Sequence, residues 1–269
     1  MNPWTSQQYI FLNYDDLLLS AMKKETTTKF SNVYEDSKRA EAYSKLKFDK
    51  TYYLAYRDLP KIIATHTTGK NALDFGCGTG RSTRFLQTLG FTTIGVDIST
   101  EMITIAQQLD PTGLYQVIKD GDVSSLPRRS YDLVLSAFTF DNIPTMNKKI
   151  RLLEGLSARL KHNGTIINLV SSPEIYTHEW ASFTTKEFPE NADAKSGDIV
   201  RIITIDINDK RPCYDIFWST EDYKKVYTHA GLRIINTYKP LATGQEPYQW
   251  VNETTIAPWT IYVLKKKYK

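Results

Sequence analysis

The sequence predicts an α/β fold in which an open, mostly parallel sheet has helices on both faces. Between residues 71 and 171, short apolar runs alternate with helical stretches, and this alternation is typical of strand–helix–strand units. The chain has 269 residues, 41% hydrophobic and 24% charged, as in globular proteins with a large core. No apolar run approaches the ~20 residues that a bilayer requires, so we expect a folded protein without a membrane span.

The segment before the sheet is predicted to be helical. Apolar and aromatic residues recur at helical spacing between 31 and 70, and Pro60 suits the first turn of a short helix that runs to Gly69. Strands dense in apolar and β-branched residues are predicted at 71–76, 92–98, 115–120, 131–138 and 164–171. Helices are predicted between them at 81–89, 99–109 and 145–161.

After residue 171 the alternation breaks. The later elements are predicted to be an inserted strand pair at 198–209 and 211–219, a helix at 220–230, and closing strands at 232–238 and 259–266. The predicted parts of the chain are therefore 1–70, 71–171, 172–218 and 219–269. The loop that begins at Pro240 is too long for a plain connection, and we expect it to form a pocket wall. The late tryptophans, which favour a flat organic ligand, are Trp180, Trp218, Trp250 and Trp259.

Composition excludes several classes of protein. Cys77 and Cys213 are the only cysteines, the four histidines are scattered, and no metal-ligand spacing is present, so we expect neither a disulfide framework nor a metal. The net charge of +4 is mild, and the terminal KKKYK is typical of a solvated end, so charge does not indicate a nucleic-acid partner. The first residues lack a basic start, which makes the cytoplasm the expected location. Nothing in the sequence indicates an oligomeric state.

The stretch LDFGCGTGR, residues 73–81, places three glycines at alternate positions at a predicted strand end. Glycines permit a tight turn and close approach of a ligand, and the helix that follows offers N–H groups to an anion. A nucleoside triphosphate loop would need a Lys that is absent here, and the dinucleotide pattern would place its third glycine one residue later. Asp74 would also repel a diphosphate, so the loop favours a ligand that carries positive charge as well.

The stretch ALDFGCGTG resembles the first signature of the class I S-adenosylmethionine-dependent methyltransferases. The resemblance continues in order through IGVDIS, GDVSSLP and YDLVLSAFTFDNI, and covers residues 38–171. It implies a Rossmann-like sheet of seven strands with an N-terminal helical lid, and here a small β insertion after the fifth strand. It also implies S-adenosylmethionine as the cofactor. The resemblance is strongest to family members that have a helical lid and methylate small molecules.

The resemblance assigns the parts of the cofactor to particular residues. The methionine part falls to the loop residues Asp74, Gly76, Cys77 and Gly78. Asp97, at the end of the next strand, accepts both ribose hydroxyls in this reading, and the alternative is a helix cap. The residues that then pack on the adenine, or else belong to the core, are Ile98 and Met102.

Further contacts follow from the later motifs. Asp122 is expected to accept from the adenine amino group and Val123 to offer its N–H, with a turn acid as the alternative. Ser136 and Ala137, at the end of the fourth strand, are expected to lie under the sulfonium, with ordinary packing at a strand end as the alternative.

The N-terminal helices of similar proteins fold over the cofactor. Tyr43 and Tyr52 are therefore expected to line the pocket. Arg57 is expected to pair with the methionine carboxylate, or else to extend along a helix surface.

The catalytic candidates are Asp141 and His178. Asp141 follows the fourth strand, where it takes a proton, holds a cationic amine, or caps the next helix. His178 is a second candidate base. The predicted function is in-line methyl transfer to a small molecule; the alternatives are methylation of RNA or protein, and cofactor binding without turnover.

Overall fold

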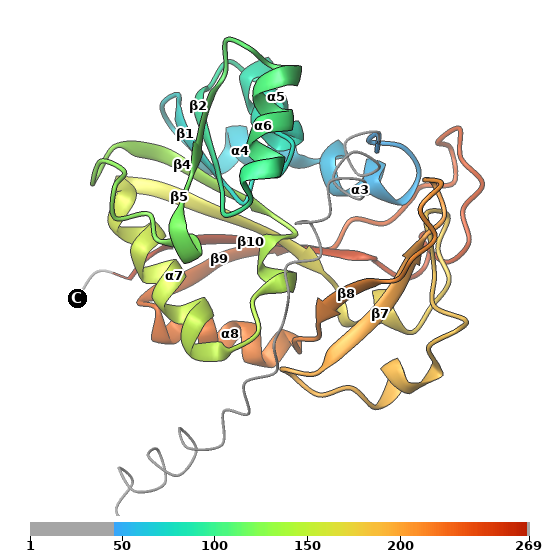
Figure 1. Cartoon of the computed structure of the whole chain (residues 1–269). Helices are drawn as coiled ribbons and strands as arrows, with labels where there is room; N and C mark the ends of the chain where they lie inside the picture. The colour runs from blue at the N-terminus through green and yellow to red at the C-terminus, as the bar shows by residue number, and fades with distance from the viewer. Residues whose placement is uncertain (1–45, 268–269) are drawn as a thin grey trace, which may run out of the picture. The chain divides into compact units, whose positions relative to one another are not determined.

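Seven strands form the main sheet of the computed structural model, which describes residues 46–267, all within the unit Val33–Lys269 (Figure 1). The strands are β1 (Asn71–Phe75), β2 (Thr92–Asp97), β3 (Leu114–Val117), β4 (Tyr131–Ala137), β5 (Leu160–Ser171), β9 (Leu232–Tyr238) and β10 (Trp259–Lys266). Their order across the sheet is β3-β2-β1-β4-β5-β10-β9. β10 is antiparallel to both of its neighbours, and the remaining neighbours pair in parallel. The predicted seven-stranded, mostly parallel sheet is confirmed.

The strand order reverses at β1. The chain leaves β1 for β2 and β3 on one side, then returns to β4 and β5 on the other side. In open sheets of this kind, ligands bind at the carboxyl ends of the strands beside such a reversal. The ends of β1 and β4 therefore define the place for a site.

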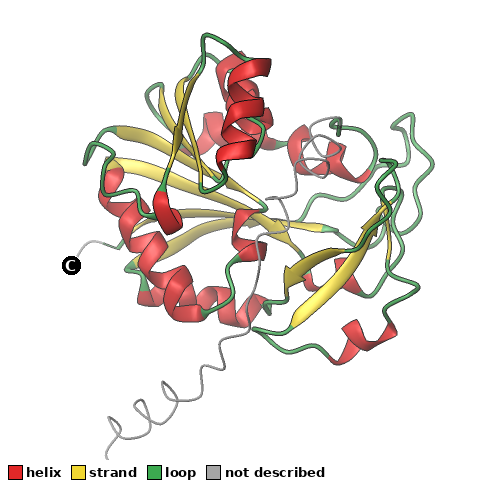
Figure 2. Cartoon of the chain, viewed as in Figure 1, coloured by secondary structure: helices red, strands yellow, loops and turns green. Residues whose placement is uncertain are grey.

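Helices cover both faces of this sheet (Figure 2). They are α3 (Thr51–Arg57), α4 (Leu59–His66), α5 (Arg81–Thr88), α6 (Thr100–Leu109), α7 (Met146–Arg159) and α8 (Thr220–His229). Thr165 and Asn168 of β5 are three residues apart and so point to opposite faces. The hydroxyl of Thr165 donates to the carbonyl of His66 in α4 at 2.6 Å, and the amide of Asn168 donates to the hydroxyl of Tyr227 in α8 at 2.9 Å.

Short hydroxyl side chains begin three of these helices. Ser99, Thr145 and Ser219 each accept a hydrogen bond from a backbone N–H in the first turn of α6, α7 and α8. A cap of this kind satisfies a donor that the helix leaves unpaired, and is worth ~1 kcal/mol. The helix starts that were predicted from the sequence thus lie within one residue of those in the structure.

A second, three-stranded sheet lies between β5 and α8 in the sequence. It is formed by β6 (Phe183–Thr184), β7 (Ile199–Thr204) and β8 (Cys213–Ile216), in that order and antiparallel. β7 and β8 are the strand pair that the sequence predicts, and the two-residue β6 adds to them. Short 3-10 helices lie at η2 (Lys119–Gly121), η3 (Thr139–Asn142), η4 (Pro173–Tyr176) and η5 (Pro189–Asp193).

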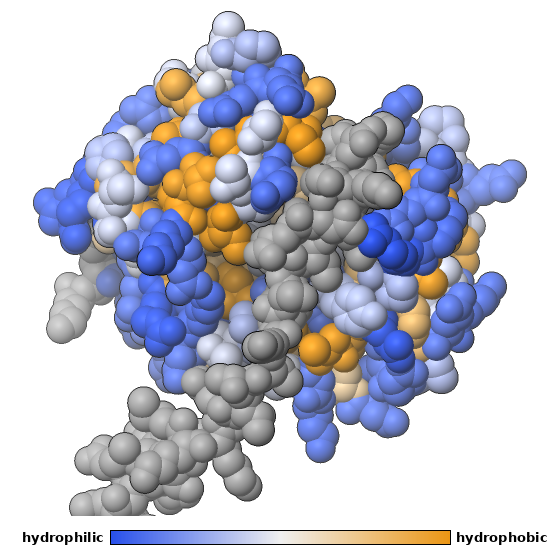
Figure 3. Space-filling view, viewed as in Figure 1, coloured by the Kyte–Doolittle hydropathy of each residue, from blue (hydrophilic) through white to orange (hydrophobic). Residues whose placement is uncertain are grey.

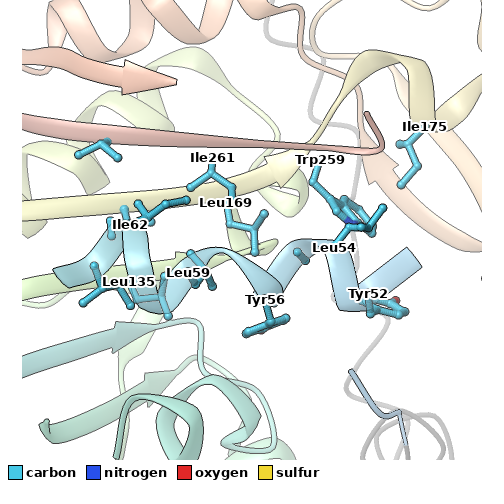
Figure 4. Close-up of a cluster of buried hydrophobic side chains, with 14 of the residues drawn as sticks. Tyr52, Leu54, Tyr56, Leu59, Ile62, Leu135, Leu169, Ile175, Trp259 and Ile261 are labelled. Atoms are coloured by element: carbon cyan, nitrogen blue, oxygen red, sulfur yellow. The ribbon is translucent and has the colours of Figure 1, made fainter. Parts of the chain in front are cut away.

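The core joins the helices α3 and α4 to the main sheet (Figure 4). Leu54 and Leu59 are fully buried against strand residues such as Leu169 and Ile261. Each buried side chain of this size stabilises the fold by ~1.5–3 kcal/mol. On the outside, the face drawn in Figure 3 has hydrophobic patches among hydrophilic side chains. Among residues 46–267, no helix combines the length and the apolar character that crossing a membrane requires.

Glu253 holds three segments together from inside the protein, where it is fully buried. Its Oε1 accepts from the hydroxyl of Thr51 in α3 and from the N–H of Ala181, both at 2.7 Å. Its Oε2 accepts from the N–H groups of Val251 and Asn252, at 2.8 and 3.1 Å. The carboxylate thereby fixes the start of α3, the residues before β6 and the loop before β10 relative to one another.

We expect Glu253→Ala to lower the free energy of unfolding by ~3 kcal/mol or more, because buried donors lose their charged acceptor. Urea denaturation followed by tryptophan fluorescence measures the change. Glu187→Ala, at an exposed position close to β6 in sequence, is the control and should change the value by less than ~0.5 kcal/mol. Equal stabilities of the two variants would contradict the role of Glu253.

Candidate active site

The glycine loop after β1 is a turn of left-handed residues. Gly76, Gly78 and Gly80 have φ values of 72°, 54° and 79°, a region that other residues enter only at a cost. The N–H groups of Gly76 and Cys77 donate to the carbonyl of Val96 on β2, at 2.8 and 3.0 Å. The loop is thereby held at the carboxyl end of β1, where the strand order reverses.

Gly76 and Gly78 exclude a side chain for different reasons. A Cβ on Gly76 would lie 2.1 Å from the hydroxyl oxygen of Thr139, so the packing of η3 requires glycine there. A Cβ on Gly78 would meet nothing within 4 Å. It would project into open space, and through this space a ligand can approach the main chain.

Asp74 lies beneath the loop and is fully buried. Its Oδ2 accepts hydrogen bonds from the hydroxyls of Ser82 and Thr83 in the first turn of α5, at 2.7 and 2.6 Å. Burial raises the pKa of Asp74 to about 6, against the lowering effect of both hydroxyls. The carboxylate thus ties the loop to α5. Its Oδ1 has no hydrogen-bond partner within residues 46–267, and the predicted contact with a methionine ammonium stays a prediction.

Asp97 ends β2 and contacts the same loop. Its Oδ2 accepts from the N–H of Gly78 at 2.8 Å, and its Oδ1 from the N–H of Ser99 at 2.9 Å. Burial raises the pKa of Asp97, and the backbone N–H groups oppose this shift. Ile98 beside it is 50% exposed, whereas Met102 is buried. The alternative that Asp97 caps α6 is wrong, because Ser99 forms that cap.

Asp122 and Val123 line a pocket that also borders α7. Asp122 is exposed and accepts from the N–H and the hydroxyl of Ser124, each at 2.7 Å, which lowers the pKa of Asp122. Asp122 therefore has the geometry of a turn acid, which was the alternative prediction for this residue. The adenine contacts predicted for the two residues stay predictions. The lining of this pocket consists of Asp120, Gly121, Asp122, Val123, Ser124, Lys148, Arg151, Leu152, Gly155 and Arg159.

The end of β4 reaches the glycine loop. Ser136 is fully buried and its Oγ has no partner in the described part of the chain, while Ala137 packs against the core. Phe138, the next residue, has a φ of 64°, which is a strained value for an aromatic residue. The hydroxyl of Thr139 then donates to the carbonyl of Gly76 at 3.3 Å. The strained turn is therefore bonded directly to the loop.

The N-terminal candidates have different outcomes. Tyr43 lies outside the described residues. Arg57 pairs with Asp58 at 2.8 Å and with Glu246 at 3.0 Å, and it donates to the carbonyl of Leu241. Its guanidinium joins α3 to the loop before β10, and the predicted pairing with the methionine carboxylate stays a prediction.

A pocket that is partly open to solvent lies beside the carboxyl ends of β4 and β5. We call it the aromatic pocket. Its lining consists of Tyr52, Phe138, Asp141, Asn142, Ser171, Ile175, Tyr176, Phe183, Ile202, Thr204, Cys213, Asp215 and Trp259. The lining thus combines α3, the ends of β4 and β5, the small sheet and the start of β10. Of the four late tryptophans, Trp259 alone is among these lining residues.

Asp141 is the buried acid of the aromatic pocket. Its Oδ2 accepts from the N–H of Ser171 at 3.0 Å, and its Oδ1 from the hydroxyl of Tyr223 at 3.3 Å. Burial raises the pKa of Asp141, whereas the Ser171 N–H and the charge of Lys149 lower it. Burial likewise lowers the pKa of Lys149, against the attraction of Asp141 and Asp215. Each group is thus held closer to neutrality than it would be in water.

The structure separates the two predicted catalytic residues. Asp141 does not cap α7, since Thr145 accepts the first-turn hydrogen bond there, so this alternative is wrong. His178 is not among the residues that line the aromatic pocket. Its Nδ1 lies 3.0 Å from both the carbonyl oxygen of Glu174 and the hydroxyl of Thr177. The geometry therefore gives no support to His178 as a base.

The sequence reasoning missed Lys149 and Asp215. Lys149 is fully buried, donates to the carbonyl of Phe140, and lies 4.8 Å from the ring centre of Trp218. It precedes Leu153 by one helical turn, and a lysine within an apolar stripe was the available signal. Asp215 accepts from the hydroxyl of Tyr176 at 3.1 Å. In the sequence, Asp215 alternates with apolar residues on a short strand, and this pattern is only a weak indication of a functional acid.

Arg81 was also missed as a possible ligand-binding group. It is the first residue of α5, and its guanidinium carbon lies 5.0 Å from the ring centre of Phe48 and 5.2 Å from that of Tyr52. The arginine thus places a positive charge between the glycine loop and α3. Its position directly after the third glycine was the signal in the sequence.

No group of three or more His, Cys, Asp or Glu suited to a metal ion is found within residues 46–267.

Comparisons with known proteins agree with this geometry. Residues 73–168 match the sequence family described as "Methyltransferase domain". A protein of Haemophilus influenzae is 28% identical over 55% of this chain and 61% of its own length. The demethylmenaquinone methyltransferase of Tropheryma whipplei is 34% identical over 29% of this chain and 33% of its own length. The chain therefore spans about three fifths or less of the length of these relatives.

A solved structure shares the fold. The S-adenosylmethionine-dependent methyltransferase of Clostridium acetobutylicum superposes with a TM-score of 0.56 and 15% identity, over 88% of this chain and 98% of that one. Residues 73–168 thus match a methyltransferase domain, and the chain shares the fold of this S-adenosylmethionine-dependent methyltransferase. The cofactor of such a domain is S-adenosylmethionine.

The site residues fit this cofactor. The open space above Gly78 allows a ligand to approach the loop. The carboxylate of Asp97, fixed by two N–H groups, suits a pair of ribose hydroxyls. The exposed side chain of Ile98 offers an apolar surface for a purine ring.

We expect Asp97→Ala to weaken the binding of S-adenosylmethionine at least tenfold, or about 1.4 kcal/mol, because the ribose hydroxyls lose their charged acceptor. Isothermal titration calorimetry measures the affinity. Glu154→Ala, which removes an exposed acid from α7, is the control and should bind as the wild type does. An unchanged affinity in Asp97→Ala would contradict the assignment of Asp97.

Proposed function

We propose that this protein transfers the methyl group of S-adenosylmethionine to a small-molecule acceptor held in the aromatic pocket. The observation that carries the proposal is the position of this aromatic-walled pocket beside the glycine loop. Tyr52, Phe183 and Trp259 form one wall, with ring centres 5.1 to 5.8 Å apart. Walls from segments distant in sequence leave a confined space, which suits a small organic molecule better than a nucleic-acid strand or a protein surface.

The demethylmenaquinone methyltransferase of T. whipplei supports this proposal, since it is named for a metabolite. Its match with this chain covers a third of its length, so it supports the class of acceptor and not the particular compound.

Alignment of the acceptor is the main contribution that we assign to the protein. S-adenosylmethionine supplies a methyl group that is already activated on a positively charged sulfur. Phe138 and Thr139 join the aromatic pocket to the glycine loop, which brings the two binding regions side by side. The rings of the pocket exclude water and restrict the orientation of the acceptor. Asp141 receives a proton where the acceptor carries one.

Labelling a cell extract tests the function itself. The protein is incubated with methyl-tritiated S-adenosylmethionine and an extract separated by molecular size. We expect enzyme-dependent label in the small-molecule fraction. Label in RNA or protein would favour the macromolecular alternative, and cofactor binding without label in any fraction would indicate a binding module.

We expect Asp141→Asn to retain the affinity for S-adenosylhomocysteine and to lower turnover by about 100-fold, because an amide cannot accept the proton. In the wild type, activity should fall as the pH drops through the raised pKa of Asp141, since the protonated acid is not a base. Initial rates across a pH series measure both effects.

Asp132→Asn is the matched control for this variant. Asp132 is a buried acid at the opposite end of β4, where it accepts from the N–H of Asn71 and pairs with Lys161. The control should keep its turnover. A wild-type rate in Asp141→Asn would remove Asp141 from the mechanism.

A further inference from the structure

We propose that the pocket between residues 120–124 and α7 binds a polyphosphate chain, meaning two or more linked phosphoryl groups. We call it the α7 pocket. Of the described residues that are predicted to bind the cofactor, only Asp122 and Val123 line it. The side of the pocket that α7 forms therefore has no part in the proposed methyl transfer, and the proposal stands independently of that function.

One face of α7 supplies the positive charges of this pocket. Lys148, Arg151, Gly155 and Arg159 line it, and spacings of three and four residues place them on the same face of the helix. At 1.5 Å per residue, the two arginines lie about 12 Å apart along the helix axis, with the glycine midway. Arg151 is exposed and forms no ion pair within residues 46–267. The charges thus form a row, which suits an elongated anion.

Arg159 is a buried cation whose charge is only partly compensated. The residue is 6% exposed, and its Nη1 donates to the carbonyl of Leu126 at 2.6 Å. Its Nε has no hydrogen-bond partner in the described part of the chain. A buried charge is costly unless it is paired and fully hydrogen-bonded. An anion in the α7 pocket, which this side chain lines, would supply the missing charge.

The two acids among the described lining residues have other partners. Asp120 pairs with Lys148 at 2.5 Å. Asp122 accepts from the hydroxyl and the N–H of Ser124, and these bonds lower the pKa of Asp122 more than the charge of Arg159 does. Asp122 is also exposed, so water and salt screen its attraction for a guanidinium. Two guanidinium groups of α7 therefore face one solvated carboxylate.

Gly155 leaves the middle of the α7 pocket open. Glycine is the poorest helix former after proline, so its place inside a helix of 14 residues needs a reason. Packing does not supply one. A Cβ at this position would meet only Val123 within 4 Å, at 3.4 Å from its Cγ2, which is an ordinary van der Waals distance. The missing side chain instead gives room for a ligand between the two arginines.

A polyphosphate chain fits these features better than a single phosphate does. Guanidinium groups bind phosphoryl oxygens through pairs of charge-assisted hydrogen bonds. A chain of phosphoryl groups spreads several negative charges along its length, so that it contacts Arg151 and Arg159 together while it passes over Gly155. A single phosphate reaches only one of the two arginines. Inorganic polyphosphate and the phosphate chain of a nucleotide share this chemistry.

Isothermal titration calorimetry with tripolyphosphate tests the proposal. The protein is first saturated with S-adenosylhomocysteine, which occupies the cofactor site, and the titration is run at constant ionic strength without divalent cations. We expect tripolyphosphate to bind at least tenfold more tightly than orthophosphate, because it contacts both arginines. Equal affinities for the two anions, or no binding of tripolyphosphate, would overturn the proposal.

Two variants locate the binding in the α7 pocket. We expect Arg151→Gln, which removes one guanidinium, and Gly155→Gln, which fills the space between the arginines, each to weaken tripolyphosphate binding at least tenfold. A retained affinity for S-adenosylhomocysteine verifies their folding. Arg233→Gln removes the same charge from an exposed position on β9 and should bind as the wild type does. Unchanged binding in both pocket variants, or an equal loss in Arg233→Gln, would show that the α7 pocket is not the site.

Titration with ATP under the same conditions identifies the source of the chain. ATP that binds more tightly than tripolyphosphate supports a nucleotide, whose base and ribose add contacts. ATP that binds more weakly supports an inorganic chain. Binding of ATP that Arg151→Gln leaves unchanged would place the nucleotide elsewhere and overturn the nucleotide form of the proposal. All of these measurements are independent of methyl transfer, so their failure leaves the proposed function in place.

Discussion

The buried carboxylate of Glu253 is the interaction on which the aromatic pocket depends. Thr51, Ala181 and Val251 come from three segments far apart in the sequence, and each donates to this one side chain. A carboxylate that leaves water loses several kcal/mol of hydration, and here four short hydrogen bonds offset that loss. Small shifts of one segment would break these bonds. The walls of the pocket are therefore held in one arrangement.

The two halves of the site differ in how they are built. The donor half is local: the glycine loop and Asp97 lie at the ends of adjacent parallel strands, and backbone geometry fixes both. The acceptor half is assembled from α3, the small sheet and the start of β10 around the end of β4. A local motif keeps the same cofactor geometry whatever surrounds it. The assembled half can vary with its insertions, which is how one domain serves many acceptors.

This difference also explains what the sequence predicted. Strand and helix positions followed from periodicity and caps, although β5 begins four residues earlier than predicted because Leu160 pairs with Tyr131 directly after α7. The hydrogen bonds of Asp97 join residues of short motifs, so its place beside the glycine loop could be predicted from the sequence. The bond between Arg57 and Glu246, which lie 189 residues apart, was not predicted. No local pattern indicates a contact over such a distance, whereas the local signals of Lys149 and Asp215 were too weak to assign them a function.

The buried Lys149–Asp141 pair has a further consequence for the pocket. Replacing buried charged groups by apolar residues is often neutral or stabilising, so stability alone gives little reason for a lysine at this position. Its ammonium packs over the rings of Trp218 and Tyr223, at 4.8 and 5.2 Å, and so has a fixed position behind the acids. From there it stabilises the charged form of Asp141, while burial opposes that form. The balance keeps the carboxylate able to take a proton, and an apolar residue in place of Lys149 would shift that balance toward the neutral acid.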